Sequence, residues 1–418
     1  MTLNDATRLF IETHLHDDTR QLALKKTPAD VDKLLALSQI EARQILSKKV
    51  PSWASNPDLL FPKHLSLEQC SSELTAKYKA KIVETHRNAS QAISADDSGT
   101  YGLSTTFIDL TGGLGIDSCF LSGNFQNAYY VENQKELCEL AENNFRILGR
   151  RINVINTDAE SFLKNHPCGS CNSWFIFVDP ARRDAFNRKM VSLHDCSPDV
   201  VELQEKMLEV AEHILIKASP MLDISLICNE LKNIKEIHIV SVKNECKEIL
   251  ILLERGFESK IKFVCVNLRQ DEQDSQDEFC CYEDDEKNAV PTFADTIRKY
   301  LYEPNSSLMK AGVFKLVSQN FKIDKLHINS HLYTSDELIY DFPGRVFEVV
   351  GFSSFDKKVR KGLLEDITKA SVATRNFPLS ANDLRKSLGL QESDDTFVFG
   401  TTMRGEKKVI ILCKRGNR

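Results

Sequence analysis

The sequence predicts an α/β fold in which a parallel sheet binds a ligand at the carboxyl ends of its strands. A glycine-rich turn, in the order DLTGGLGID, follows the apolar run 107–108. Three further short apolar runs come after it at helix-length intervals, and each leads into an acidic residue. Strands and helices that alternate in this way form parallel sheets, and ligands bind in the crevice outside the carboxyl ends of the strands.

The glycine-rich turn predicts a close approach between the backbone and a ligand. Gly113 and Gly115 have no Cβ, so they accept φ values that are closed to other residues. Backbone N–H groups at the start of the following helix are then free to bind a carboxylate or a phosphate. Ser118 stands where G-x-G-x-x-G requires its third glycine, and G-x-x-x-x-G-K-[ST] is absent from the sequence. Neither a dinucleotide nor a nucleotide triphosphate is therefore favoured by this turn.

The acidic residues that follow the other three apolar runs are expected at the same edge of the sheet. Glu132 follows the run 128–131, about twenty residues after the turn, where a Rossmann-type fold places the carboxylate that holds a ribose diol. Asp158 follows the run 153–156, and Asp179 follows the run 174–178.

This order of glycine loop and acids resembles the class I S-adenosylmethionine (SAM) dependent methyltransferases. The resemblance implies that the loop backs the methionine part of SAM, that Glu132 binds the ribose hydroxyls and that Asp158 lies near the adenine amine. An α/β domain that binds another nucleotide, or no ligand, is the alternative. The implied cofactor-binding residues are Asp109, Thr111, Gly112, Gly113, Gly115, Asp117, Glu132, Asp158 and Ala159.

The segment after the fourth strand resembles the acceptor loop of methyltransferases that act on base amines. Their [DN]-P-P-[FYW] loop accepts the N–H groups of the exocyclic amine, and its aromatic side chain stacks on the flipped base. This chain has DPAR at the same place, without the second proline and the aromatic. Its arginines either stack on a base or hold a phosphate, or form salt bridges to neighbouring acids. The implied catalytic residues are Asp179, Pro180, Arg182 and Arg183.

Motifs further along the chain carry a closer resemblance. DLTGGLGID and VDPARR are combined with YEPNSSLMKAGVFK and RNFPLSANDLRKSLGL. Together they resemble a bacterial group of SAM-dependent methyltransferases with a ferredoxin-like domain and a C-terminal THUMP-like domain. THUMP domains are associated with RNA-modifying enzymes, so the implied substrate is RNA. The expected domains are an N-terminal helical region at 1–93, the methyltransferase domain at 94–270, a small ferredoxin-like α+β domain at 288–344 and a THUMP-like α+β domain at 345–418.

Charge is unevenly distributed along the chain, whose formal net charge is −6. Residues 271–287 contain nine acids and one lysine, which predicts a solvated loop or a domain boundary. From Leu301 to the end, 19 Lys and Arg face 14 Asp and Glu. A mildly basic C-terminal part is compatible with a nucleic acid partner, although a solvated face gives the same count.

Several further elements are expected from periodicity and from capping residues. The apolar pattern predicts a helix at 29–46 that begins with Thr27-Pro28, and another at 74–83 with Ser71 or Ser72 as its N-cap. Alternatively, the polar residues around Ser71 close over the cofactor. Two strands are expected at 236–243 and 248–253, and the resemblance implies that they form an antiparallel pair at the sheet edge. Helices are also expected at 295–302 and 306–320.

Neither a membrane span nor a metal site is expected. No apolar run approaches the roughly 18 residues that a span needs, and the first residues show no signal-peptide order, so a cytoplasmic protein is expected. The twelve cysteines fit free thiols in a reducing compartment. Cys168 and Cys171 form a lone C-x-x-C with no second pair, whereas zinc needs four ligands. Methyl transfer itself needs no metal.

The sequence therefore favours a SAM-dependent methyltransferase that acts on RNA, most simply on a base of rRNA or tRNA. Two alternatives stay open. One is a methyltransferase that acts on a protein or a small molecule. The other is an RNA-binding protein that keeps the SAM fold without turnover. The sequence does not indicate an oligomeric state.

Overall fold

The computed structural model describes residues 3–62, 67, 70–94, 105–165, 174–182, 192–269, 276–356 and 362–416. The chain divides into two compact units. Unit 1 contains residues 1–236 and 249–259, and unit 2 contains residues 237–248 and 260–418.

A nine-stranded sheet holds the glycine-rich loop, in the order β11-β10-β8-β9-β7-β4-β1-β2-β3. Strands β1, β2, β3, β4 and β7 are parallel: β1 pairs with both β2 and β4, β2 pairs with β3, and β4 pairs with β7. Strand β9 is antiparallel to β7, and β11 is antiparallel to β10. The bounds are β1 Thr106–Asp109, β2 Asn127–Glu132, β3 Asn153–Asn156, β4 Trp174–Val178, β7 His213–Ala218, β8 Ile234–Val242, β9 Glu245–Glu254, β10 Lys262–Leu268 and β11 Gln276–Tyr282.

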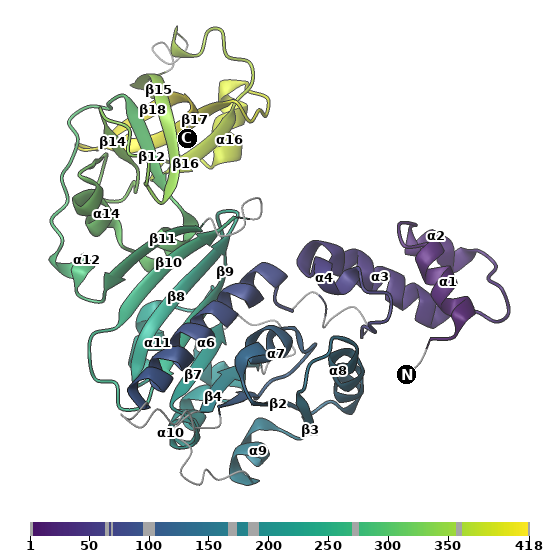
Figure 1. Cartoon of the computed structure of the whole chain (residues 1–418). Helices are drawn as coiled ribbons and strands as arrows, with labels where there is room; N and C mark the ends of the chain where they lie inside the picture. Colours follow the sequence, from purple (N-terminus) through teal and green to yellow (C-terminus); the bar gives the residue numbers. More distant parts are fainter. Residues whose placement is uncertain are drawn as a thin grey trace. The chain divides into compact units, whose positions relative to one another are not determined.

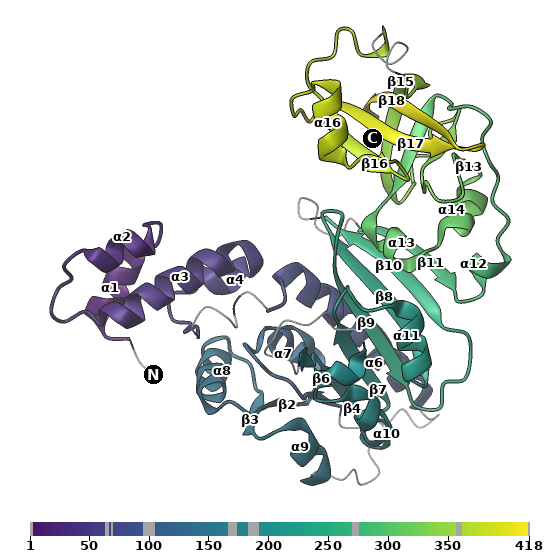
Figure 2. The same ribbon diagram turned by 180° about the vertical axis from the view of Figure 1, so that it is seen from behind.

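Helices cover both faces of the parallel strands in unit 1. Helices α6 and α7 lie on one face (Figure 1), and α10 and α11 lie on the other (Figure 2). This arrangement confirms the predicted α/β class. It also explains the continuous apolar runs of the sequence, because strands that are covered on both faces need apolar side chains on both. The bounds are α6 Glu73–Ser94, α7 Ile116–Leu121, α8 Lys135–Ile147, α9 Ala159–Asn165, α10 Val200–Val210 and α11 Ile224–Glu230.

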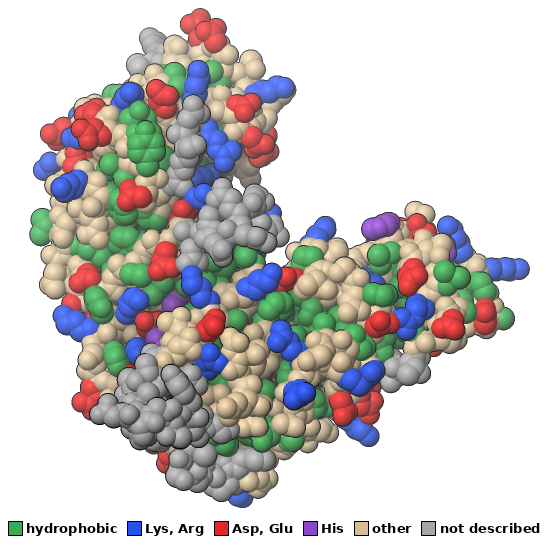
Figure 3. Space-filling model, in the orientation of Figure 1, with side chains coloured by type: hydrophobic (Ala, Val, Ile, Leu, Met, Phe, Trp, Pro, Cys, Tyr) green, Lys and Arg blue, Asp and Glu red, His purple; other side chains and the backbone are tan. Residues whose placement is uncertain are grey.

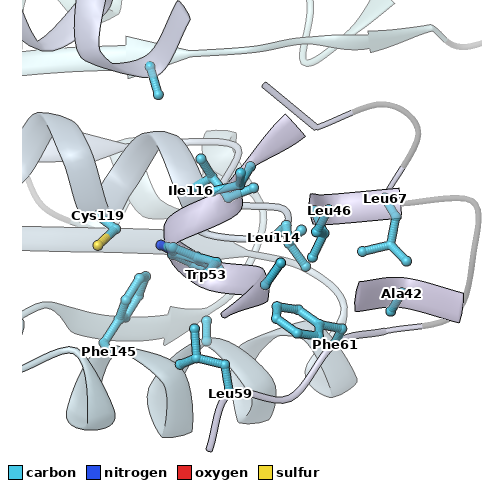
Figure 4. Close-up of a cluster of buried hydrophobic side chains, with 14 of the residues drawn as sticks. Ala42, Leu46, Trp53, Leu59, Phe61, Leu67, Leu114, Ile116, Cys119 and Phe145 are labelled. Carbon is cyan, nitrogen blue, oxygen red and sulfur yellow. The ribbon is translucent and has the colours of Figure 1, made fainter. Parts of the chain in front are cut away.

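Of the N-terminal helices, α3 and α4 pack against the glycine-rich loop and α8, whereas α1 and α2 pack on α3. Trp53 and Phe61 share a buried cluster with Leu114, Ile116 and Phe145 (Figure 4). These helices are α1 Asp5–Thr13, α2 Thr19–Leu24, α3 Lys33–Lys49 and α4 Pro51–Ala54. The predicted start of the third helix at Thr27-Pro28 is wrong, because the Asp32 carboxylate accepts a hydrogen bond from Leu35 N and caps the helix there.

A seven-stranded sheet forms the core of unit 2, in the order β13-β14-β12-β15-β18-β17-β16. Its strands are antiparallel except for the parallel pair β16 and β17. The elements are β12 Tyr300–Pro304, β13 Asp324–Lys325, β14 Tyr333–Ser335, β15 Gly344–Ser354, β16 Ser371–Arg375, β17 Thr396–Met403 and β18 Lys407–Arg415, with helices α12 Asp285–Asn288, α13 Ser306–Ala311, α14 Phe314–Phe321 and α16 Ala381–Leu388.

Four sequence expectations fail in whole or in part in this part of the chain. The acidic stretch is not a loop throughout, because 276–282 is strand β11 and 285–288 is helix α12. The strands at 236–243 and 248–253 form as predicted, but β10 and β11 extend the sheet beyond them. The helix expected at 295–302 is absent, since its last residues begin β12. The single helix expected at 306–320 is broken at Gly312, whose φ is +74°.

Within the described residues, no helix is long and apolar enough to cross a membrane.

Candidate functional site

The carboxyl ends of β1, β2 and β4 bring the predicted acids to one edge of the sheet. The register pairs Asp109 with Tyr130 on one side and with Phe177 on the other. Glu132 ends β2, and Asp179 follows β4 by one residue. The parallel pairing therefore collects residues that are separated by seventy positions in the chain.

The glycine-rich loop packs directly on the side chain of Tyr130. A Cβ on Gly112 would lie 2.2 Å from Cε2 of this ring, which is fully buried. The Tyr130 hydroxyl donates a hydrogen bond of 2.6 Å to the carbonyl of Gly113. Gly113 and Gly115 have φ values of +53° and +80°. All three glycines are thus required by the geometry, two by φ and one by close packing.

Alanine at position 112 is expected to destabilise the fold by about 1–3 kcal/mol, because the new methyl group overlaps a ring that has no space to move. Thermal unfolding of Gly112→Ala measures the loss. The matched control is Gly362→Ala, where a Cβ would meet no atom within 4 Å. Equal melting temperatures for Gly112→Ala and wild type would mean that the Tyr130 ring is not fixed.

Asp109 lies inside the loop and does not face the crevice. It is 1% exposed and accepts hydrogen bonds from Thr111 N (3.0 Å) and Ser118 Oγ (2.5 Å). Burial raises the pKa of this carboxyl from 3.8 to about 7, and the nearby charges of Asp117 and Asp179 act in the same direction. In this geometry Asp109 joins the start of the glycine-rich loop at Thr111 to the following helix at Ser118.

The raised pKa of Asp109 predicts a loss of stability as the pH rises. Between about pH 4 and pH 7 the folded state keeps a proton on Asp109 that the unfolded chain has released, so a rising pH favours unfolding. Urea unfolding measures the free energy of unfolding at about pH 5 and pH 8. From the lower to the higher pH, this free energy is expected to decrease more in wild type than in Asp109→Asn. An equal decrease in the two proteins would contradict this linkage.

Glu132 is fixed between the loop and the start of α8. Its Oε2 accepts a hydrogen bond from Gly113 N (3.0 Å), and its Oε1 accepts one from Gln134 N (2.8 Å). The side chain is half-buried. A carboxylate has about four lone-pair positions, so two of them stay available to a ligand on its open side.

Asp117 points toward the N-terminal region. Its Oδ2 accepts a hydrogen bond of 2.7 Å from Ser71 Oγ, and its Oδ1 lies 3.1 Å from Nζ of Lys79, which is fully buried. Burial alone would raise the pKa of Asp117, but the charges of Lys79 and Lys217 and the Ser71 hydrogen bond lower it overall. Asp117 is therefore ionised in a polar cluster beneath the loop. Ser72, the other candidate cap, accepts from Thr75 N at the start of α6.

Asp158 and Ala159 lie at the start of α9. Asp158 is exposed and accepts hydrogen bonds from Ser161 N (2.8 Å) and Ser161 Oγ (2.7 Å), which lower the pKa of its carboxyl. These contacts make Asp158 a helix cap. Ala159 is 5% exposed and packs inward.

Asp179 is held at both its backbone and its side chain. Its N–H donates to Thr111 Oγ1 (2.7 Å), and its Oδ2 lies 2.5 Å from Nζ of Lys217 near the end of β7. Pro180 is half-buried, and β5 (Ala181–Arg182) pairs with β6 (Cys196–Ser197). Arg183, the side chain of Arg182 and the C-x-x-C pair Cys168 and Cys171 lie outside the described residues.

Sequence reasoning missed the two lysines that neutralise these acids. Lys79 lies on α6 and Lys217 on β7, and each reaches its partner across a long stretch of chain. One signal was available for Lys217: it is a charged residue near the carboxyl end of the apolar run HILIKA, where the crevice is expected. Lys79 had no such signal, because KYKAK resembles an exposed helix face.

Fold and site together define a class I SAM-dependent methyltransferase architecture with added C-terminal domains. A ferredoxin-like domain model matches residues 300–343, and a THUMP domain-like model matches residues 344–415. The structure of the "putative methyltransferase from Porphyromonas gingivalis W83" matches over 100% of both chains, with 30% identity and a TM-score of 0.83. The chain belongs to this family.

Other solved structures match the fold over shorter lengths. M. capricolum TrmK, solved in complex with S-adenosyl-homocysteine (SAH), is 12% identical over 47% of this chain and 72% of its own, with a TM-score of 0.29. An rRNA methylase from Streptococcus thermophilus is 16% identical over 41% of this chain and 96% of its own, with a TM-score of 0.28. Likeness at this level supports no functional conclusion. No curated protein matches the chain.

Proposed function

We propose that this chain transfers the methyl group of SAM to a base of an RNA. The observation that carries the proposal is the convergence of the glycine-rich loop, Glu132 and Asp179 at one edge of the sheet. A loop that touches both acids fixes their spacing, as the positioning of two reactants requires. Membership of the methyltransferase family supports the reaction class.

The loop and Glu132 fit the cofactor. Gly112 lets the loop lie against Tyr130, where any side chain would collide with the ring. Glu132 is oriented by Gly113 N and Gln134 N, so its carboxylate meets a ribose diol without first being ordered. SAM, when bound, supplies an electrophilic methyl carbon. Asp117 and Asp109 do not contact the cofactor in this proposal but support the loop from behind. The carboxylate of Asp117 is engaged by Ser71 and Lys79, and that of Asp109 by Thr111 and Ser118.

Asp179 is the residue that fits an acceptor amine. Among the described residues, its Oδ2 pairs with Lys217 and its Oδ1 has no partner. A carboxylate oxygen that accepts an N–H of an exocyclic amine favours the nitrogen lone pair that attacks the methyl carbon. Thr111 fixes the backbone of Asp179 by accepting its N–H, and Lys217 holds the carboxylate through Oδ2, so Oδ1 is preorganised for that contact.

The C-terminal domains support RNA as the substrate. A THUMP domain-like model covers residues 344–415, and the chain is mildly basic from Leu301 onward. On the face shown in Figure 3, the coloured Lys and Arg side chains are interspersed with acids. RNA contact through separate cations of this kind, such as the exposed Lys407, is expected to weaken with salt.

Methyl transfer from radiolabelled SAM tests the proposal. Full-length protein is incubated with total RNA, total protein and small-molecule fractions from cells that lack this gene, and with the same fractions from wild-type cells. Label that is sensitive to ribonuclease, and present only with RNA from the deleted strain, is the expected result. Label in the protein or small-molecule fraction would replace RNA with that substrate. Binding of SAH without transfer to any fraction would leave a non-catalytic RNA-binding protein.

A further inference from the structure

A second group of titratable side chains lies at the opposite end of the parallel strands from Asp179. His213 is the first residue of β7, and it pairs in register with Glu254, the last residue of β9. His86 reaches the same place from α6. The two histidines are 7% (His86) and 4% (His213) exposed, so both imidazoles are withdrawn from water.

The donor atoms of these three residues converge on one point. One ligand atom each from His86, His213 and Glu254 lies within 4.8 Å of the others, and His213 Nε2 is 3.0 Å from Glu254 Oε2. Metal bonds of about 2.1 Å place tetrahedral ligand atoms about 3.4 Å apart. The three donors therefore surround one ion after small side-chain movements. Glu236 Oε2 lies 3.3 Å from His86 Nε2, outside this group of three, and would supply a fourth donor after its side chain moves toward His213 and Glu254.

We propose that His86, His213 and Glu254 bind a divalent transition metal ion, with Glu236 as a fourth ligand. Imidazole and carboxylate donors suit zinc best among the common ions of this class, and four protein ligands make a closed, structural site. The ion would join α6 to the start of β7 and the end of β9. This role is independent of the proposed methyl transfer.

The protonation of the cluster suits a metal ion. Burial lowers the pKa of His213 to about 4, so its imidazole is neutral near pH 7. Burial would raise the pKa of Glu254, but hydrogen bonds and charges from Lys235 and His213 lower it overall, so its carboxylate is ionised. The His213 ring also stacks on Phe175 with centroids 5.7 Å apart, which fixes its orientation. A neutral, oriented imidazole beside a carboxylate is ready to bind without deprotonation.

Lys235 is the group that competes with the metal. Its Nζ lies 2.5 Å from Glu254 Oε2, where an ion would bind. The lysine side chain is 27% exposed, so it can turn into solvent when an ion displaces it. Removal of this ammonium should therefore strengthen metal binding, whereas a cluster built only for hydrogen bonding would lose a partner and gain nothing.

Titration of the chelator-treated full-length protein tests the site. Co²⁺ is followed by its visible absorption bands, and Zn²⁺ by competition with a chromophoric chelator. One ion per chain is expected. His213→Asn should weaken binding at least tenfold, and Lys235→Gln should strengthen it severalfold. His14→Gln is the control, because this histidine pairs with Asp17 at a part-exposed position of the N-terminal region.

Three results would overturn the proposal. The first is a wild-type titration with no stoichiometric Zn²⁺ or Co²⁺. The second is equal affinity in wild type and His213→Asn. The third applies if His213→Asn does not fold: Lys235→Gln then decides alone, and an affinity equal to or weaker than that of wild type excludes the ion. Calorimetric SAH binding by Lys235→Gln should equal that of wild type, which separates this site from the cofactor site.

Discussion

Asp179→Asn is expected to lower the rate of methyl transfer at least about 100-fold, while SAH affinity stays within about twofold. The amide keeps the size of the side chain. It replaces one of the two acceptor oxygens with an NH₂ donor, and it loses the charge that pairs with Lys217, so the oxygen that remains turns to Lys217 and the NH₂ group faces the acceptor amine. Single-turnover transfer to RNA measures the rate, and calorimetric titration of SAH measures the cofactor affinity.

Lys217 provides the matched variants for this result. Lys217→Arg keeps a cation beside Asp179 and is expected to retain activity within about threefold, whereas Lys217→Met is expected to lose about tenfold or more because the carboxylate is no longer oriented. A wild-type rate in Asp179→Asn would place the acceptor contact elsewhere. Asp179 would then serve only as the partner of Lys217.

The parallel part of the fold could be predicted because its signals are local. Each of β1, β2, β3 and β4 is a short apolar run that leads into an acid, and each lies within one or two residues of its predicted position. Helix α10 carries the same kind of local signal, because the Asp199 carboxylate caps it by accepting from Val201 N and Glu202 N. Capping and apolar periodicity need only neighbouring residues, so one sequence is enough to find them.

The failures lie where tertiary contacts override local pattern. In β11 the exposed residues Glu278, Cys280 and Tyr282 alternate with Phe279 and Cys281, which are buried and pair with β10. This alternation is the pattern of a strand with one buried face, but the density of charge concealed it. In β12, the pairing with β14 and β15 decides the structure of a segment whose sequence is equally compatible with a helix.

The site was predicted in part for the same reason. The loop glycines were found because their requirement is local, as the φ values of Gly113 and Gly115 show. The pairing of the acids with Ser71, Lys79 and Lys217 could not be predicted, because these partners come from distant segments and only Lys217 has a signal in the sequence, its place near the end of an apolar run. Their contacts depend on how α6 packs on α7 and on where β7 enters the sheet. A single sequence carries no signal of either.

Glu132→Ala is expected to weaken SAM and SAH binding at least about tenfold, or about 1.4 kcal/mol. The substitution removes the carboxylate that we propose for the ribose hydroxyls. It also releases Gly113 N and Gln134 N, which lose their acceptor. The loop then loses one of the contacts that hold it in place. Calorimetric titration of both ligands measures the loss.

Glu132→Gln and Glu136→Ala separate these two effects. Glutamine keeps an oxygen that accepts from one of the two backbone N–H groups, but it has no charge. If the affinity of Glu132→Gln for SAH lies between those of wild type and Glu132→Ala, the difference between wild type and Glu132→Gln belongs to the charge of the carboxylate. Glu136 lies one turn further on, exposed in the first turn of α8, and its substitution should leave affinity unchanged. Thermal unfolding of the three variants checks whether the loop, which packs on Tyr130 at Gly112, keeps its fold. If Glu132→Ala bound SAM and SAH as tightly as wild type, Glu132 would not bind the ribose, and SAM would have to be held by other residues of the crevice.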